Sequence, residues 1–162
     1  MNTTIKKAQI KDGNYLSVEY TEQQADGFST IKKDCKIAVH IDLKNAFKEL
    51  DKHLANLSYQ HDDKGDLCTN TISCKGFSIG GSGDSEGVTL TGVRTLENDK
   101  ILNISSPFQR FDSDYFDYDF ISDLIDCLDK CKEEVNAYLF AGKHEEDNQL
   151  ELFEELEEIE NQ

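Results

Sequence analysis

The chain has little proline and no long apolar run. Pro107 is the single proline among 162 residues, which argues against a long proline-rich linker. No apolar stretch approaches the roughly 20 residues needed to span a membrane, and no apolar segment typical of a secretory leader follows Met1. The cysteine count is five, an odd number that does not suit a full set of disulfides. We therefore expect a cytoplasmic protein with reduced thiols.

Lysine and arginine are missing from two segments that hold much of the acid. Residues 111–129 carry seven acidic residues and residues 144–162 carry nine, with no basic residue in either segment. Together these sixteen charges equal the net charge of −16, so the rest of the chain is formally neutral. This distribution opposes direct contact between the C-terminal third and nucleic-acid phosphates. It favours a partner with a basic groove, or a protein that itself binds DNA.

The remaining composition is that of a globular protein. Hydrophobic residues make up 37% of the chain and charged residues 31%. A chain of this length suits one domain of about 110 to 140 ordered residues. We predict a single domain over residues 1–141, followed by a flexible acidic tail over residues 142–162.

The first half of the domain reads as three strands and a helix. Residues 5–11 and 15–23 alternate around an Asp-Gly-Asn turn, which predicts a hairpin. Residues 28–39 predict a third strand, with Ile31, Ile37 and Val39 as its buried positions. Asp42 is the expected N-cap of a helix. The buried side of this helix recurs at spacings of three and four and consists of Leu43, Ala46, Phe47, Leu50, Leu54 and Leu57.

The second half repeats this order. Residues 68–80, 88–96 and 100–108 predict strands separated by glycine-rich or polar turns. A helix is expected from about Asp117 to Phe140. Its apolar stripe consists of Ile121, Leu124, Ile125, Leu128, Cys131, Val135 and Leu139.

These elements predict an α+β fold built from two successive βββα units, residues 5–58 and 68–140. We expect antiparallel sheet packed by two helices. Two arrangements fit the pattern. The units lie side by side around a pseudo-twofold axis, or the strands form one antiparallel sheet or barrel with helices against one face.

No stretch of the sequence predicts catalysis, a metal or a cofactor. The four histidines lack the motif context of a catalytic base and are interpreted as structural or surface residues. Cys68 and Cys74 lie six residues apart and Cys127 and Cys131 one helical turn apart, and neither pair has the spacing of a zinc knuckle. We interpret them as core residues; a four-cysteine zinc site that joins both pairs is the alternative. The acidic segment that begins at Asp112 departs from the EF-hand pattern, because its sixth position is Asp117 instead of glycine. We expect a protein that is not an enzyme.

The acidic segment before and within the last helix is a candidate interaction surface. Its carboxylates alternate with aromatic residues, and such a surface can imitate DNA in the basic groove of a nucleic-acid enzyme. An inhibitor of a nucleic-acid-binding defence enzyme is therefore one functional hypothesis. The candidate residues are Asp112, Asp114, Asp117, Asp119, Asp123 and Asp126.

The tail contains a short peptide, Gln149-Leu150-Glu151-Leu152-Phe153. It resembles the Gln-Leu-Ser/Asp-Leu-Phe peptide by which bacterial polymerases, repair proteins and some phage proteins bind the sliding clamp. The resemblance implies that Gln149 enters a polar pocket, that Leu152 and Phe153 fill the hydrophobic cleft of the clamp, and that Leu150 packs at its edge. Glu151 departs from the usual Ser or Asp.

The resemblance implies an accessory protein of a bacterium or its phage that is recruited to the clamp in DNA replication, repair or recombination. Leu152, Leu156 and Ile159 also fall at helical spacing, so a helix packed on the domain is the alternative for the tail. A third hypothesis is a single-strand DNA-binding protein with an acidic tail. Its lysines and aromatic residues would be Lys6, Lys7, Lys11, Lys32, Lys33, Lys36, Tyr15, Tyr20 and Phe28.

Overall fold

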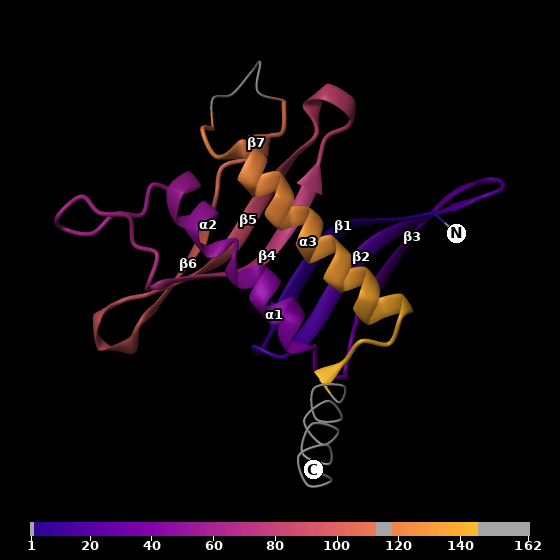
Figure 1. Cartoon of the computed structure of the whole chain (residues 1–162), viewed down its shortest axis with the longest axis horizontal. Coiled ribbons are helices and arrows are strands. Elements are labelled where there is room, and N and C mark those ends of the chain that lie inside the picture. Colours follow the sequence, from indigo (N-terminus) through magenta and orange to yellow (C-terminus); the bar gives the residue numbers. More distant parts are fainter. Residues whose placement is uncertain (1, 113–117, 146–162) are drawn as a thin grey trace, which may run out of the picture.

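The structure is a computed structural model that describes residues 2–112 and 118–145. It is an α+β protein in which helices cover one face of a seven-stranded antiparallel sheet (Figure 1). The strands are β1 (Thr3–Lys11), β2 (Tyr15–Gln24), β3 (Gly27–Asp34), β4 (Ile72–Gly80), β5 (Gly87–Thr95), β6 (Ile101–Ser105) and β7 (Gln109–Arg110). The helices are α1 (Ile41–Lys48), α2 (Asp51–Leu57) and α3 (Ile121–Phe140), with short 3₁₀ turns at Gly83–Ser85 and Glu97–Asp99.

The strands run in the order β3-β2-β1-β4-β5-β6, and β7 pairs with β5. Two meanders, β1–β2–β3 and β4–β5–β6, therefore meet where β1 and β4 pair antiparallel with Ala8 opposite Phe77. Neighbouring strands that follow one another in the chain pair through short turns. Joining the two meanders needs only this one central pairing between distant segments.

One face of the sheet is apolar and the other is polar. On β1 and β2 the alternating residues toward the helices are buried, and the residues between them lie on the face that no described helix covers. The core between sheet and helices includes Ile5, Ala8, Ile10, Leu16, Val18, Tyr20, Phe77, Val88 and Leu90. Figure 1 shows α1, α2 and α3 across this single face.

The helix predicted after the third strand forms as two helices, α1 and α2, separated at Glu49 and Leu50. Its predicted apolar side is confirmed, because all six of those residues are buried. The prediction that Asp42 is the N-cap is wrong. His40 is the N-cap residue, and its Nδ1 accepts a hydrogen bond from the Asp42 amide at 3.0 Å. Asp42 instead lies in the first turn, where the helix dipole favours its negative charge.

The third strand ends earlier than predicted, at Asp34 instead of residue 39. Ile37 is 49% exposed, so its predicted burial is wrong, whereas Val39 is buried as predicted. Val39 is held by an isolated bridge to His144, and its amide donates to Asn14 O at 2.8 Å. Val39 is therefore buried through contacts to distant segments and not as part of β3.

The strand predicted over residues 100–108 is interrupted at Pro107. Proline has no amide hydrogen to donate to a sheet, so β6 ends at Ser105 and β7 begins at Gln109. Buried Ser106 maintains the connection to β5, because its amide donates to Leu90 O and its hydroxyl accepts from the Leu90 amide. These two hydrogen bonds keep the segment between β6 and β7 paired with β5 next to Pro107.

The helix predicted from about residue 117 to 140 forms as α3 and begins at Ile121, later than predicted. The predicted start at Asp117 lies outside the described residues. Cys127 and Cys131 are buried on the inner side of α3, which agrees with their interpretation as core residues. Among the described residues, no helix combines the length and apolar character needed to cross a membrane.

Gly92 of β5 lies close to both β4 and α2. A Cβ atom at this position would collide with the Ser73 carbonyl oxygen and with Leu54 of α2. We predict that Gly92→Ala lowers the free energy of unfolding by about 1–3 kcal/mol, because neither the backbone nor the buried leucine can move away freely. Chemical denaturation monitored by circular dichroism measures this loss.

Gly80→Ala is the matched control. Its Cβ would meet the ring of Phe108, which is partly exposed and able to shift. We expect a change of less than about 1 kcal/mol there. Equal losses for the two variants would contradict the close approach at Gly92.

Candidate functional site

The structure describes part of the predicted site residues. The tail peptide lies outside the described residues, and so do Asp114 and Asp117 of the acidic face. Asp112 is partly buried, whereas Asp119 and Asp126 are exposed. The tail residues concerned are Gln149, Leu150, Leu152 and Phe153.

Asp123, the remaining member of the predicted acidic face, is bound to α2. Its Oδ2 lies 3.0 Å from Lys52 Nζ and 2.7 Å from His53 Nε2. The hydrogen bond from Lys52, followed by that from His53, lowers the pKa of the Asp123 carboxyl. Lys130 and Lys132 follow on the same helix. The described part of α3 therefore presents a mixed charge pattern instead of a purely acidic surface.

His53 is the most enclosed polar side chain of this region. Its side chain is 2% exposed, and both ring nitrogens are engaged. Nε2 contacts Asp123 and Nδ1 lies 2.7 Å from the hydroxyl oxygen of Tyr118. A carboxylate only accepts hydrogen bonds, so Nε2 carries the hydrogen and Nδ1 of the neutral ring accepts from Tyr118. Burial lowers the pKa of His53 more than the Asp123 charge raises it.

A cavity of about 420 Å³ opens beside this histidine. It lies between α2 and the start of α3, and apolar side chains form part of its wall. Polar groups enter it from Lys52, His53 and Asp123, so a bound ligand would meet both charge and apolar surface. The lining residues are Lys52, His53, Asn56, Leu67, Tyr118, Phe120 and Asp123.

Cys127 adds a thiol to the same cluster. It lies one helical turn after Asp123, and its Sγ is 3.7 Å from Asp123 Oδ2. Burial raises the pKa of the Cys127 thiol to about 11, so this thiol is protonated at neutral pH and is a poor nucleophile. Within residues 2–112 and 118–145, the atoms of His53, Asp123 and Cys127 form a group of metal-ligating type, all within 4.8 Å of one another.

The sequence did not predict that His53, Asp123 and Cys127 lie together. The spacing of Asp123 and Cys127 is visible in the sequence, but His53 lies 70 residues before Asp123 and faces it only through helix packing. The apolar neighbours of His53 in α2 gave the one available signal, since they place its ring toward the core.

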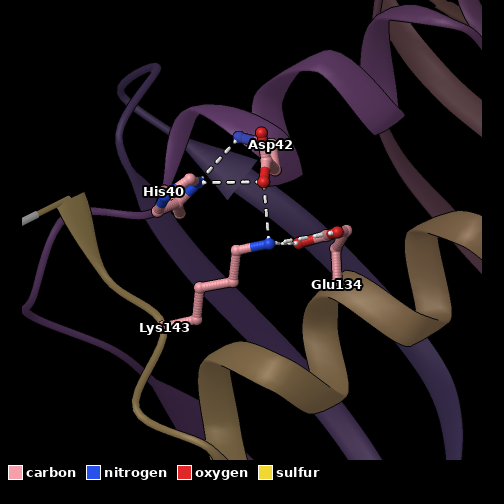
Figure 2. A network of polar contacts seen from close by, with 4 residues as sticks. All are labelled: His40, Asp42, Glu134 and Lys143. Carbon is pink, nitrogen blue, oxygen red and sulfur yellow. Dashed lines mark hydrogen bonds and ion pairs between the residues drawn. The ribbon is translucent and has the colours of Figure 1, made fainter. Parts of the chain in front are cut away.

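The start of the tail is fastened to the domain by a second polar network (Figure 2). Lys143 Nζ lies 2.7 Å from Asp42 Oδ2 of α1 and 3.0 Å from Glu134 Oε2 of α3. The side chains of Asp42 and Glu134 both point toward the Lys143 ammonium, and His40 contacts Asp42. Two helices and the segment after α3 are thereby joined at one point.

Backbone contacts extend this attachment by two residues. The Glu145 amide donates to Ala38 O at 3.0 Å, and His144 bridges to Val39. The Tyr138 hydroxyl donates to Ile37 O at 2.5 Å, and the Tyr138 ring stacks edge-on against His144. The chain is therefore fixed to the domain as far as Glu145.

Several of the residues predicted to bind single-stranded DNA lie on the face of the sheet that no described helix covers. Lys7 and Lys32 flank Glu19 in register across β1, β2 and β3, and a groove of about 290 Å³ runs over them. Glu19 and the pair between Lys11 and Asp34 offset part of the positive charge there. The excess of lysine at this groove is modest.

The three predicted stacking aromatics separate into two groups. By register, Tyr15 and Phe28 lie on the uncovered face, and they are 39% and 75% exposed. Tyr20 is 2% exposed on the opposite face, with the Lys33 ammonium 5.9 Å from its ring centroid. The prediction that Tyr20 stacks on a base is therefore wrong, because its ring belongs to the core.

We predict that Lys143→Met loosens the start of the tail with little effect on the whole domain. Methionine keeps the apolar stem and removes both ion pairs. Because these pairs are partly exposed, the free energy of unfolding should fall by about 0.5–1 kcal/mol. Local opening should make the Glu145 amide hydrogen exchange faster, which NMR-detected hydrogen exchange measures.

Lys48→Met removes an exposed lysine at the end of α1 and serves as the control. It should leave exchange at Glu145 unchanged. Unchanged exchange in Lys143→Met as well would show that the backbone contacts alone hold this segment.

Comparisons of the chain with protein-family models, with curated proteins and with solved structures found no match.

Proposed function

We propose that the protein is a non-enzymatic accessory protein of DNA replication, repair or recombination, recruited to a bacterial sliding clamp by residues 149–153. The observation that carries this proposal is the resemblance of residues 149–153 to the clamp-binding peptide, and the fixed start of the tail adds where a bound clamp would be held. The chain is held as far as Glu145, four residues before Gln149. Four extended residues span at most about 14 Å. A clamp bound to this peptide would therefore be held close to the end of the domain formed by α1 and α3.

The proposed peptide has the energetics of a tether. Burial of Leu152 and Phe153 contributes about 1.5–3 kcal/mol each, and ordering the tail offsets part of this gain. Binding of roughly micromolar affinity follows. Such affinity suits a protein that is recruited to a site of DNA synthesis and released again.

We predict that Leu152→Ala combined with Phe153→Ala weakens binding to a purified bacterial clamp at least about 100-fold, since two buried side chains are lost. Isothermal titration calorimetry of the full-length protein with the clamp measures the change. Leu156→Ala combined with Ile159→Ala is the matched control. It removes two apolar tail residues outside the peptide and should leave the affinity unchanged. Equal affinity for wild type and the Leu152/Phe153 variant would refute recruitment by this peptide.

Single-strand DNA binding is a second candidate. It is supported by the uncovered sheet face, where Lys7 and Lys32 line a groove on the same side as exposed Tyr15 and Phe28. Lysines that follow a phosphate backbone and aromatic rings that stack on bases are the usual means of binding a single strand. This function is compatible with recruitment to a clamp, because the two contacts use different parts of the chain.

For this candidate we predict that Lys7→Ala combined with Lys32→Ala weakens binding to a labelled oligothymidylate. The slope of log affinity against log salt should also become shallower by about 1.4, since two phosphate contacts are lost. Fluorescence anisotropy at several salt concentrations measures both effects. Lys130→Ala combined with Lys132→Ala on α3 is the control and should bind as wild type does. Absence of salt-sensitive binding by the wild type would rule out this candidate.

A further inference from the structure

We propose that His53, Asp123 and Cys127 form a binding site for a divalent transition-metal ion of the zinc class. Asp123 and Cys127 are one turn apart on α3, so their side chains project from the same side of the helix. His53 projects toward them from α2. Two ligands from one helix and a third from a facing helix are a common way to build a metal site between helices.

The distances suit such an ion after a small adjustment. Zinc bonds of about 2.0–2.3 Å in a tetrahedral site place the ligand atoms about 3.3–3.7 Å from one another. Cys127 Sγ and Asp123 Oδ2 are already 3.7 Å apart, and His53 Nε2 and Asp123 Oδ2 are 2.7 Å apart. The carboxylate must therefore move from the imidazole by about 0.6–1.0 Å, while the ligand atoms of His53 and Cys127, which lie within 4.8 Å of each other, take up the same range. Asp123 is half exposed and has room for this motion.

Lys52 is the group that an entering ion displaces. Its ammonium contacts the same carboxylate oxygen that faces His53, at 3.0 Å. The lysine side chain is 48% exposed and is free to turn into solvent. The ion would replace one positive charge beside Asp123 by two, and the Cys127 thiolate would balance the added charge.

The surroundings of His53 also suit a metal ligand. A histidine bound to a metal through one ring nitrogen usually donates a hydrogen bond from the other, which fixes the ring. Here Nδ1 lies 2.7 Å from the Tyr118 hydroxyl oxygen, and Asn56 Nδ2 lies 3.4 Å from the same oxygen. With an ion on Nε2, the hydrogen moves to Nδ1 and Tyr118 becomes the acceptor. The existing contact therefore serves both tautomers.

The ligand set selects the class of ion. One imidazole, one carboxylate and one thiolate favour zinc or cobalt over magnesium and calcium, which prefer oxygen ligands. Three protein ligands leave the fourth tetrahedral position to water, and the adjoining cavity supplies the space for it. On binding, the S–H bond of Cys127 breaks, a sulfur–metal bond forms and the proton passes to the buffer.

Cobalt(II) titration of the untagged full-length protein tests the site. A thiolate bound to cobalt gives an intense charge-transfer band in the near ultraviolet, which carboxylates of the acidic tail do not produce. We expect this band to saturate at one equivalent and to disappear when zinc is added. No band in the wild type would overturn the proposal.

Variants then assign the ligands. Cys127→Ser should abolish the band, and Asp123→Asn should weaken cobalt affinity at least ten-fold. Cys131→Ala is the matched control, because it removes a buried cysteine one turn further along α3 that is not in the ligand set. It should keep the band. A band that survives Cys127→Ser, or that disappears in Cys131→Ala while its circular dichroism is native, contradicts the assignment.

Tyr118→Phe distinguishes a metal site that depends on the orientation of His53 from binding of cobalt by the Cys127 thiol alone. It removes the hydroxyl that orients His53 and leaves all three ligands in place. The band should remain, with cobalt affinity about 10-fold weaker. Unchanged affinity in this variant, or equal affinity for calcium and cobalt in the wild type, would contradict a transition-metal site that depends on His53.

Discussion

The whole molecule depends on burying one face of a single antiparallel sheet. A sheet with one apolar face is stable only when another layer covers that face, and here α1, α2 and α3 form the covering layer. The opposite face has no such layer among the described elements, so its alternating positions carry polar and charged side chains. Two kinds of chemistry follow from this division: exposed lysines on the bare face, and enclosed polar groups between the helices.

The enclosed cluster at His53 is a polar part of this covering layer. Burying a polar group without partners costs free energy, so the histidine is tolerated only because Tyr118 and Asp123 satisfy both ring nitrogens. The same two contacts tie α2 to the start of α3. A stabilising role and a ligand-binding role are compatible here, since an ion would replace the contact to Asp123 by two stronger ones and leave the contact to Tyr118 intact.

Local patterns predicted the α+β class, most strand positions and the buried sides of the helices, because alternation and helical spacing are properties of short segments. They failed where distant segments decide the structure. β3 ends at Asp34, and Val39, which was predicted to belong to it, is instead held by a bridge to His144 from the segment after α3. His40, not Asp42, caps α1, and the Asp42 carboxylate is instead paired with Lys143 from the segment after α3. The pairing of helices that places a histidine beside an acid has no local signature either.

The attachment of the tail has a geometric consequence for any partner. Glu145 is bonded to Ala38, and the neighbouring Val39 is bonded to Asn14 in the turn between β1 and β2. Lys44 of α1 also donates to the Asn14 side chain. Glu145 therefore lies near the end of the sheet that carries the turn between β1 and β2, and Lys11 of the lysine groove lies at the same end of β1. A protein held by the tail and a strand held on the bare face would approach the same end of the molecule.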